Sequence, residues 1–517
     1  MGTQNKRSGK VENMIGLEKT REQEQLRIDE AKDIEERRKH GQFATPFSLA
    51  REIMSYGLDL LDENAISFLE PSLGTGAFYS ALVYEIDGTK KVINQATGIE
   101  IDPQYSNAAK SIWGNNRLQV YNADFTHSLP NEKYNFLVTN PPYVRHHYIL
   151  QEEKNYLGES AKNETGIEVS GLAGFYCYFM LLSHKWLAPG AICGWLIPSE
   201  FMDVNYGNAI KKYLLNRVHL LRVHRYDPDN SKFDDALVSS CVVWFKNEII
   251  DYDYDIEFSY SGTHRAPLQR KIVKKSVLLS ERKWTRFPGK EVRDNKKDVA
   301  TIGDYFTIKR GLATGANNFF ILEKGRIESL GLDMSFFKPI LPSPRNLKTD
   351  FVETDSNGNP KLEPQYYLLD CSLSEMEIHE KHPALWEYLQ SGISETSNKY
   401  LCRNRKTWYW QEQRQATRFL CSYMGRGSAG GTPIRFILNL SEAIVTNSYL
   451  MLYPKERLQQ VISNNPGIVY QIWEELRTIG ADEIADEGRV YGGGLKKIEP
   501  KELAKVACDG LRTVCNM

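Results

Sequence analysis

The chain has 517 residues, a hydrophobic content of 41% and a formal net charge of −1. This length and composition predict two or three globular domains and exclude a fibrous or disordered class. The nearly neutral charge argues against a protein that coats nucleic acid indiscriminately, although a net value leaves local basic patches open.

Neither a membrane span nor a disulfide framework is expected. The most apolar stretch, residues 172–198, is interrupted by His184, Lys185 and Gly190, which favours a buried helix followed by a buried strand. The first 40 residues are polar and charged throughout, so no signal peptide is expected. Eight scattered cysteines, without a Cys-x-x-Cys pair or a Cys/His cluster at zinc spacing, predict reduced thiols, a cytoplasmic location and no metal.

The chain starts with a charged extension. Residues 1–40 mix acidic and basic side chains with sparse apolar positions, which predicts one mostly exposed helix from Glu18 to Lys39. We expect this extension to pack on the following domain or on a partner.

From residue 41 to about residue 250, short apolar runs alternate with helical stretches. This pattern is typical of an α/β domain whose mainly parallel sheet is covered on both faces. The expected strands are 66–70, 96–101, 118–121, 135–139, 191–197, 219–225 and 237–245. The last of these follow one another closely, which predicts an antiparallel edge.

A glycine turn follows the first expected strand. The strand ends at Glu70 and runs through Pro71, Gly74 and Gly76 into a helical stretch. Glycines let the backbone approach a ligand closely, and the helix N-terminus offers free N–H groups. The turn therefore predicts a nucleotide cradle.

Acidic residues follow the next two strands. Glu100 and Ile101 end the second strand, where a carboxylate can accept hydrogen bonds from both ribose hydroxyls. After the third strand, Asp124 can bind an adenine amino group and Phe125 can cover the adenine face.

The fourth strand leads into Asn140, Pro141, Pro142 and Tyr143. An Asn oxygen, a backbone oxygen held by proline and an aromatic ring can together grip a flat exocyclic amino group. Asn and Pro also dominate ordinary turns, so the segment alone leaves a simple turn open.

In this order, Glu-Pro-x-x-Gly-x-Gly (70–76), Gly-Ile-Glu-Ile-Asp (98–102), Ala-Asp-Phe (123–125) and Asn-Pro-Pro-Tyr (140–143) resemble the motifs of S-adenosylmethionine-dependent N6-adenine DNA methyltransferases. A Gly-Gln-Phe-Ala-Thr-Pro segment (41–46) and a long C-terminal region make the chain similar to the gamma class, the TaqI-like group of type II restriction-modification systems. The resemblance covers about residues 41–250 and is looser at 310–320 and 492–500.

The resemblance implies an organisation in four parts. These are a charged helical extension (1–40), a Rossmann-like methyltransferase domain with a mainly parallel seven-stranded sheet (41–250), a basic linker (251–300) and a mixed α+β target-recognition domain (301–517). Between Arg265 and Arg310, 14 basic residues stand against 5 acidic ones, which predicts a stripe that neutralises DNA phosphates.

The resemblance also implies the roles of individual residues. Asn140 and Pro141 would hold the amino group of a flipped-out adenine, and Tyr143 and Phe233 would stack on its ring. The residues expected to bind S-adenosylmethionine are Phe43, Thr45, Pro46, Glu70, Pro71, Gly74, Gly76, Glu100, Ile101, Asp124, Phe125 and Asn140. Those expected to contact DNA are Arg145, Arg310, Asn317 and Asn318.

The expected partners are double-stranded DNA with a specific recognition sequence and a separate restriction endonuclease, with the chain a monomer or weak dimer. Two alternatives stay open: an RNA or protein glutamine N-methyltransferase, which Asn-Pro-Pro-Tyr also resembles, and a non-catalytic DNA-recognition subunit. The long region after residue 300 favours DNA over the first, and the intact motifs favour catalysis over the second.

Overall fold

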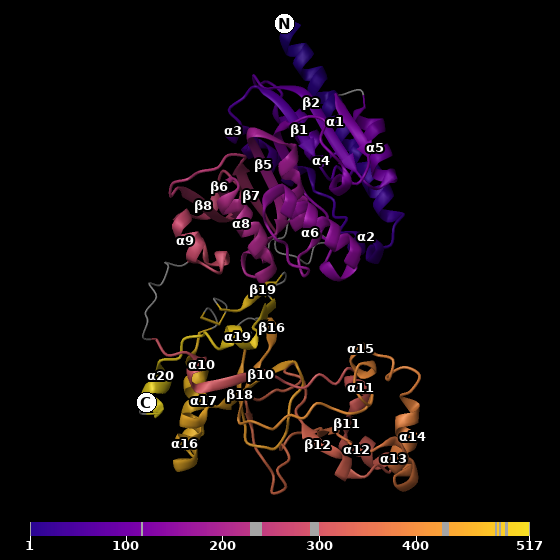
Figure 1. Cartoon of the computed structure of the whole chain (residues 1–517), viewed down its shortest axis with the longest axis vertical. Coiled ribbons are helices and arrows are strands. Elements are labelled where there is room, and N and C mark those ends of the chain that lie inside the picture. The colour runs from indigo at the N-terminus through magenta and orange to yellow at the C-terminus, as the bar shows by residue number, and fades with distance from the viewer. Residues whose placement is uncertain are drawn as a thin grey trace. The chain divides into compact units, whose positions relative to one another are not determined.

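The computed structural model describes residues 2–114, 117–227, 240–289, 299–426, 434–480, 483–484, 487–491 and 495–515. The chain divides into two compact units, Met1–Val292 and Arg293–Met517, which follow the colour bar from indigo to yellow in Figure 1. Within the described ranges, every helix is too short or too polar to cross a membrane.

A nine-stranded sheet forms the centre of the first unit, in the order β3-β2-β1-β4-β5-β7-β6-β8-β9. From β3 to β5 all neighbours are parallel, whereas β7 runs antiparallel between β5 and β6. The strands are β1 (Ala65–Glu70), β2 (Val92–Glu100), β3 (Leu118–Asn122), β4 (Tyr134–Thr139), β5 (Leu187–Pro198), β6 (His219–Arg225), β7 (Ser240–Lys246), β8 (Asp255–Gly262) and β9 (Pro267–Lys274). The predicted α/β fold with a mostly parallel sheet is confirmed.

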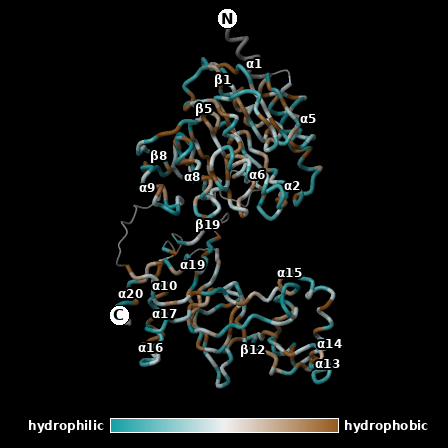
Figure 2. Tube along the Cα trace, viewed as in Figure 1, coloured by the Kyte–Doolittle hydropathy of each residue, from teal (hydrophilic) through white to brown (hydrophobic). Residues whose placement is uncertain are grey.

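Both faces of this sheet are buried because successive side chains enter two different cores. Along β4, Phe136 and Val138 pack with residues of α3, α4 and α5, whereas Leu137 packs with residues of α6, α7 and α8. Figure 2 shows hydrophobic residues along the central strands. The helices are α3 (Phe47–Leu60), α4 (Ala77–Glu85), α5 (Pro103–Trp113), α6 (Gln151–Thr165), α7 (Phe175–Ser183), α8 (Asn208–Asn216) and α9 (Lys275–Ser280).

Two predictions about this unit need correction. Within the described residues the sheet has nine strands and not seven, because β8 and β9 extend it beyond β6. Both strands, together with α9, lie in the 251–300 segment that we expected to be a linker. For β9 the error arose because it is an edge strand: Val273 is its buried residue, whereas Leu268 and Ile272 are exposed.

The charged extension forms two helices. Helix α1 spans Gly2–Glu30 and α2 spans Ile34–His40, so the single helix expected at 18–39 is interrupted at residues 31–33. Ile28 of α1 is buried against Tyr105 and Ala108 of α5. The extension therefore packs on the sheet domain, as expected.

The second unit combines three small sheets with short helices. A five-stranded sheet has the order β10-β18-β15-β17-β13, and two three-stranded sheets have the orders β11-β14-β12 and β16-β20-β19. Helix α17 spans Ile468–Thr478. The strands are β10 (Phe306–Arg310), β11 (Ile321–Glu323), β12 (Phe337–Ile340), β13 (Phe351–Val352), β14 (Tyr366–Leu369), β15 (Phe419–Ser422), β16 (Met424–Arg426), β17 (Phe436–Asn439), β18 (Tyr449–Pro454), β19 (Arg489–Tyr491) and β20 (Leu495–Lys497). The other helices are α10 (Ile302–Tyr305), α11 (Asn317–Phe320), α12 (Lys324–Ser329), α13 (Glu375–Lys381), α14 (Pro383–Ser391), α15 (Tyr400–Arg403), α16 (Glu456–Asn464), α19 (Pro500–Leu503) and α20 (Gly510–Cys515).

Helix α3 packs closely on the sheet where Gly57 faces Trp244 of β7. A Cβ atom on Gly57 of α3 would lie 2.5 Å from the Trp244 ring and 3.0 Å from Phe136. We predict that Gly57→Ala lowers the free energy of unfolding by about 1–3 kcal/mol, because overpacking outweighs the better helix propensity of alanine. Gly158 in α6 has open space around it, so Gly158→Ala should stabilise the protein by roughly 0.5–1 kcal/mol. Urea denaturation of both variants measures the contrast, and equal effects would contradict the packing argument.

Candidate functional site

Three neighbouring parallel strands carry polar residues to one edge of the sheet. Strands β2, β1 and β4 lie side by side, and their carboxyl ends are at Glu100, Glu70 and Thr139. In open α/β sheets, ligands bind in the crevice beyond these carboxyl ends. The sheet order therefore brings together the three motifs that the sequence indicated.

The glycine turn between β1 and α4 has a backbone that favours glycine. Gly74 and Gly76 have φ angles of +56° and +91°. A Cβ on Gly76 would lie 2.7 Å from the Trp113 indole nitrogen, which itself donates a hydrogen bond to the Thr75 carbonyl oxygen at 2.9 Å. A Cβ on Gly74 would meet nothing within 4 Å, so this residue presents bare backbone to open space.

Glu70 lies buried beneath the turn, with 2% of its surface exposed. Its carboxylate accepts a hydrogen bond from the Tyr79 N–H at 3.2 Å. Burial raises the pKa of Glu70 well above its ordinary value, although the Tyr79 N–H and the nearby Arg21 oppose this. Glu70 thus fixes the start of α4 from below, and the neighbouring Pro71 is buried beside it.

Glu100 joins the turn to the end of β2. One carboxylate oxygen accepts the Gly74 N–H at 2.8 Å, and the other accepts the Asp102 N–H at 2.9 Å. Burial raises the pKa of Glu100 despite these two hydrogen bonds. A carboxylate has about four acceptor positions, so two remain for a ligand's hydroxyl groups. Next to it, Ile101 is 64% exposed.

The third motif, Asp124 and Phe125, has its hydrogen-bond and packing partners within the protein. Asp124 accepts hydrogen bonds from the Thr126 N–H at 2.8 Å and the Thr126 hydroxyl at 2.6 Å, and it contacts His127 at 3.1 Å. The Phe125 ring is 2% exposed and packs 5.2 Å from Phe179. Capping and core packing explain both residues, and their expected contacts with an adenine ring stay predictions.

Asn140 brings distant parts of the chain together. Its side-chain nitrogen donates to the Phe43 carbonyl oxygen and to the Thr45 hydroxyl, both at 3.2 Å. Its side-chain oxygen is buried and has no hydrogen-bond partner among the described residues. An unsatisfied buried acceptor costs about 1–3 kcal/mol, which a hydrogen-bond donor on a ligand would recover.

A side chain that the sequence did not single out holds the Asn140 backbone. The Ser72 hydroxyl donates to the Asn140 carbonyl oxygen at 2.8 Å and contacts the Thr139 hydroxyl at 2.8 Å. Ser72 belongs to the glycine turn, so the turn and the Asn140 segment are directly linked. A serine in a loop carries little sequence signal, and only the strand order shows its role.

Tyr143 is fixed at both its backbone and its hydroxyl. Its N–H donates to the Gly41 carbonyl oxygen at 3.3 Å, and its hydroxyl donates to the Leu196 carbonyl oxygen at 3.0 Å. Burial raises the pKa of the Tyr143 hydroxyl. A Cβ on Gly41, whose φ is +66°, would lie 2.3 Å from the Tyr143 nitrogen, so only glycine fits there. The Phe43 ring lies 5.9 Å from the Tyr143 ring.

The remaining expected residues lie in the first unit, outside the described residues, or in the second unit. Pro141 is buried, whereas Pro46 and Arg145 are exposed, with Pro46 at the start of α3. Phe233 lies outside the described residues. In the second unit, Asn317 and Asn318 line a cavity of about 400 Å³, whose other walls are Ala313, Thr314, Gly315, Ala316, Lys399, Leu401 and Asn447. The Arg310 guanidinium lies 4.1 Å from the Tyr423 ring centroid.

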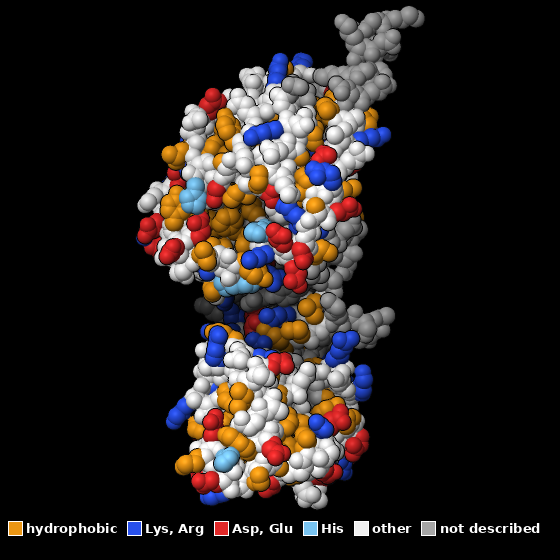
Figure 3. Space-filling model, turned by 90° about the vertical axis from the view of Figure 1, so that its right-hand side faces the viewer, with side chains coloured by type: hydrophobic (Ala, Val, Ile, Leu, Met, Phe, Trp, Pro, Cys, Tyr) orange, Lys and Arg blue, Asp and Glu red, His pale blue; other side chains and the backbone are white. Residues whose placement is uncertain are grey.

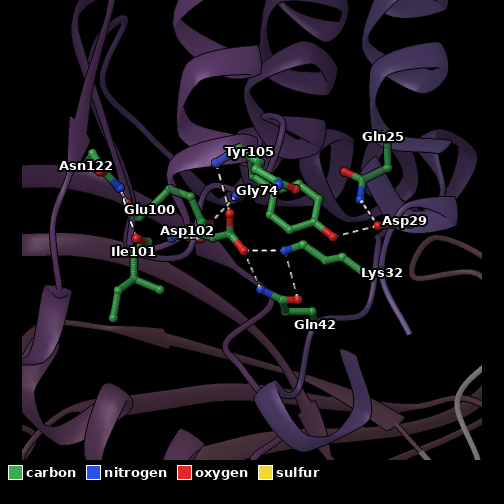
Figure 4. A network of polar contacts seen from close by, with 11 residues as sticks. Gln25, Asp29, Lys32, Gln42, Gly74, Glu100, Ile101, Asp102, Tyr105 and Asn122 are labelled. Carbon is green, nitrogen blue, oxygen red and sulfur yellow. Dashed lines mark hydrogen bonds and ion pairs between the residues drawn. The ribbon is translucent and has the colours of Figure 1, made fainter. Parts of the chain in front are cut away.

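A chain of polar contacts extends from Glu100 into the N-terminal extension (Figure 4). Lys32 forms an ion pair with Asp102, and the Gln42 side chain donates to the same carboxylate at 3.1 Å. Burial by itself would raise the pKa of Asp102, but these contacts and the Gln104 N–H outweigh it and lower the pKa. Because Lys32 and Asp102 are 70 residues apart, sequence spacing gave no sign of this contact.

One group in the described part of the first unit has the donor types of a metal site. Ligand atoms of Glu52, His224 and His264 lie within 4.8 Å of one another. The group is already hydrogen-bonded, with His264 Nδ1 3.2 Å from Glu52 and His224 Nδ1 2.9 Å from Ser259. These contacts link α3, β6, β8 and the turn after β8.

Comparisons with known proteins match both units. Residues 79–233 match a family described as the Eco57I restriction-modification methylase, and residues 281–514 match the C-terminal domain of the type II methyltransferase M.Eco57I. The type II methyltransferase M.AccI of Acinetobacter calcoaceticus is 26% identical over 487 residues, which cover 91% of this chain and 86% of the relative. M.XamI of Xanthomonas campestris pv. amaranthicola is 24% identical over 379 residues, covering 73% and 68%.

Solved structures share the fold. The type IIL restriction-modification enzyme MmeI, solved in complex with DNA, superposes with a TM-score of 0.50 at 13% identity, over 80% of this chain and 59% of that one. This likeness supports the α/β fold, and the chain spans about three fifths of the length of that enzyme. The two family matches and the two relatives make the chain similar to type II restriction-modification methyltransferases.

The raised pKa of Glu70 makes a prediction about stability. The folded protein binds a proton at Glu70 more tightly than the unfolded chain does, so stability falls as pH rises from the ordinary pKa through the raised one. Glu70→Gln carries a neutral group of similar shape. Its free energy of unfolding should therefore improve relative to wild type as the pH rises above the ordinary pKa of a glutamate. The exposed Glu63→Gln is the control, and urea denaturation curves that run parallel for all three proteins would refute the prediction.

Proposed function

We propose that this protein is a site-specific DNA methyltransferase that transfers a methyl group from S-adenosylmethionine to N6 of a flipped-out adenine in duplex DNA. Its cellular role would be to protect host DNA from a cognate restriction endonuclease. The matched families and relatives are restriction-modification methyltransferases by name, which supports DNA methylation. The observation that carries the proposal is the buried, unsatisfied side-chain oxygen of Asn140 at the end of β4.

The residues at the edge of the sheet fit the parts of S-adenosylmethionine, which supplies an electrophilic methyl group. The free acceptor positions of Glu100 suit the two ribose hydroxyls, and the open face of Gly74 allows close approach of the backbone. Exposed Ile101 offers apolar cover beside them. Phe43 and Thr45 are placed by Asn140 to line the methionine end, where Pro46 follows them.

Asn140 and Pro141 would hold the adenine amino group through its two hydrogens. The free oxygen of Asn140 would accept one hydrogen and the Pro141 carbonyl oxygen the other, which orients the nitrogen lone pair toward the methyl group. The Asn140 side chain cannot rotate freely, because its nitrogen is held by Phe43 and Thr45 and its backbone by Ser72. Such a rigid acceptor favours the transition state without a covalent intermediate.

The flipped base would stack on Tyr143. Unstacking a base from the duplex costs roughly a few kcal/mol, and stacking on an aromatic ring returns about 1–3 kcal/mol. The Tyr143 hydroxyl is held by the Leu196 carbonyl oxygen, so the ring is oriented before any base arrives. Phe233 remains the candidate for the opposite face of the base.

The second unit would read the DNA sequence. Its cavity places the amide groups of Asn317, Asn318 and Asn447 together with the cation of Lys399, which are side chains suited to base edges and phosphate. Arg310 and Arg145 are further candidates for contacts with DNA. Figure 3 shows basic and acidic side chains intermixed over one face of the molecule, so phosphate contacts would be local.

The basic stripe expected between residues 265 and 310 is partly neutralised within the described residues. Arg265 pairs with Asp59, Arg270 with Glu257, Lys274 with Asp255 and Arg286 with Glu281. These basic side chains can bind DNA phosphates only by giving up their carboxylate partners. We therefore propose that the stripe contributes less to phosphate binding than the count of charges indicated.

The amino-group clamp predicts a separation of catalysis from cofactor binding. Asn140→Ala should lower the methylation rate by about 10²–10³-fold, the usual effect of removing one group that stabilises a transition state. Affinity for S-adenosylmethionine should stay within a few-fold, because Glu100 and the glycine turn are unchanged. The exposed Asn155→Ala in α6 is the control.

The assay supplies labelled S-adenosylmethionine with duplex DNA, RNA or protein, and then maps the modified base. Methylated adenine at one recurring sequence is the expected result. Label in RNA or protein alone would establish the alternative methyltransferase, whereas cofactor binding without any transfer would favour a DNA-recognition subunit. Full activity of Asn140→Ala would remove the clamp from the mechanism.

If the flipped base stacks on Tyr143, DNA binding should depend on the aromatic ring of this residue and not on its hydroxyl. Tyr143→Phe keeps the ring and loses the hydroxyl that bonds to Leu196, so it should retain activity within a few-fold. Tyr143→Ala should raise the KM for DNA by about 10–100-fold, which corresponds to the loss of one base-aromatic stack. Steady-state kinetics with a duplex that contains the mapped site measure both, and equal losses in the two variants would argue against stacking.

A further inference from the structure

The N-terminal segment 18–42, which we call the strap, contacts both sides of the candidate cofactor site. It comprises the end of α1, the turn at 31–33, α2 and the loop to Gln42. Its contacts converge on Thr75 in the glycine turn and on Asp102 beyond β2. Figure 4 shows how Gln25, Asp29 and Lys32 approach Asp102 and Tyr105 from the side of α1.

The first anchor is the Thr75 hydroxyl, which lies between the two positive-φ glycines. It accepts a hydrogen bond from Arg21 Nη1 at 3.1 Å and donates one to Gln25 Oε1 at 2.7 Å. Arg21 is itself buried and pairs with Glu18 at 2.6 Å, and the Ser80 hydroxyl of α4 donates to the same carboxylate. The conformation of the turn is therefore coupled to the position of α1.

The second anchor is the Asp102 carboxylate. Lys32 and Gln42 bind one of its oxygens, while the other oxygen caps α5 by accepting the Gln104 N–H at 2.9 Å. The Lys32 ammonium also lies 4.3 Å from the Tyr105 ring centroid. The Tyr105 hydroxyl donates to Asp29 of α1 at 2.6 Å, which fastens the strap a second time.

These anchors reach the proposed ribose-binding carboxylate through the backbone. The Asp102 N–H and the Gly74 N–H hold the two oxygens of Glu100, so Lys32 acts on Glu100 through Asp102. Lys32 also compensates the negative charge of Asp102, which would otherwise disfavour a charged Glu100 beside it. Neither Lys32 nor Arg21 needs to touch a ligand for this effect.

We propose that the strap is an integral part of the cofactor site, in which Lys32 and Arg21 are positioning residues that set the affinity for S-adenosylmethionine. The inference rests on the proposed function. Because the strap and the site share one hydrogen-bond network, cofactor binding stabilises the strap and the ordered strap favours cofactor binding to the same extent. The extension thereby becomes a means of regulating cofactor affinity, because a partner that displaces the strap would weaken cofactor binding.

Lys32→Met tests the proposal directly. It removes the charge while keeping the apolar stem, and it should weaken binding of S-adenosylmethionine by about tenfold or more, as the loss of a supporting contact to a liganding residue does. The rate at saturating cofactor should stay within about twofold, because the Asn140 clamp is untouched. Lys32→Arg, which keeps the ion pair, should restore most of the affinity.

Arg27→Met is the matched control. Arg27 lies on α1, close in sequence to Lys32, and pairs with Glu24 on the exposed side of the helix, with 65% and 36% of the two side chains accessible. Calorimetric titration of each full-length protein with S-adenosylmethionine gives the affinities. If the wild-type protein binds S-adenosylmethionine and Lys32→Met binds it with the same affinity, the inference is overturned and the proposed function stands. Absence of binding to the wild-type protein would instead reject the proposed function.

Hydrogen exchange on the wild-type chain gives a second test that does not depend on a variant folding. Addition of S-adenosylmethionine should slow exchange at backbone amides of both residues 18–30 and residues 72–76, because the two segments share the Thr75 contacts. Slower exchange confined to the turn, with the strap unchanged at saturating cofactor, would show that the two are uncoupled and refute the proposal.

Discussion

The hydrogen bond from the Gly74 N–H to Glu100 is the contact on which the candidate site depends. It exists because β1 and β2 are parallel neighbours, so the turn after one strand meets the carboxylate that ends the other. The same edge carries Asn140 from β4, and Ser72 joins it to the turn. Three motifs separated along the chain thus form one surface through strand order alone, before any ligand binds.

Two poorly solvated carboxyl groups lie in this surface. Glu70 and Glu100 lie near each other, and burial raises the pKa of both carboxyl groups. Like charges in a poorly solvated place oppose folding unless hydrogen bonds offset them. The backbone N–H groups of Tyr79, Gly74 and Asp102 provide this compensation, which explains why the turn and the start of α4 must keep their conformation.

The sequence carried enough information for most of the sheet, because buried parallel strands appear as continuous apolar runs. Strand β9 escaped notice for the opposite reason: as an edge strand it exposes most of its side chains, and its charge resembles that of a linker. The residue types of the candidate site were also visible, since Gly74, Glu100 and Asn140 sit at the ends of recognisable strands.

Contacts within the site were harder to foresee. Asn140 reaches Phe43 and Thr45 across 97 and 95 residues, and Lys32 reaches Asp102 across 70. Such pairs follow from tertiary packing and leave no periodic pattern in the sequence. The charged extension looked like a solvated helix for the same reason, because two of its buried positions are occupied by Glu18 and Arg21, which satisfy each other. A polar residue type is thus a poor guide to exposure wherever opposite charges pair inside the fold. The positioning role of the strap follows from the tertiary structure, in which its two anchors, Thr75 and Asp102, belong to the two segments whose backbone N–H groups hold Glu100.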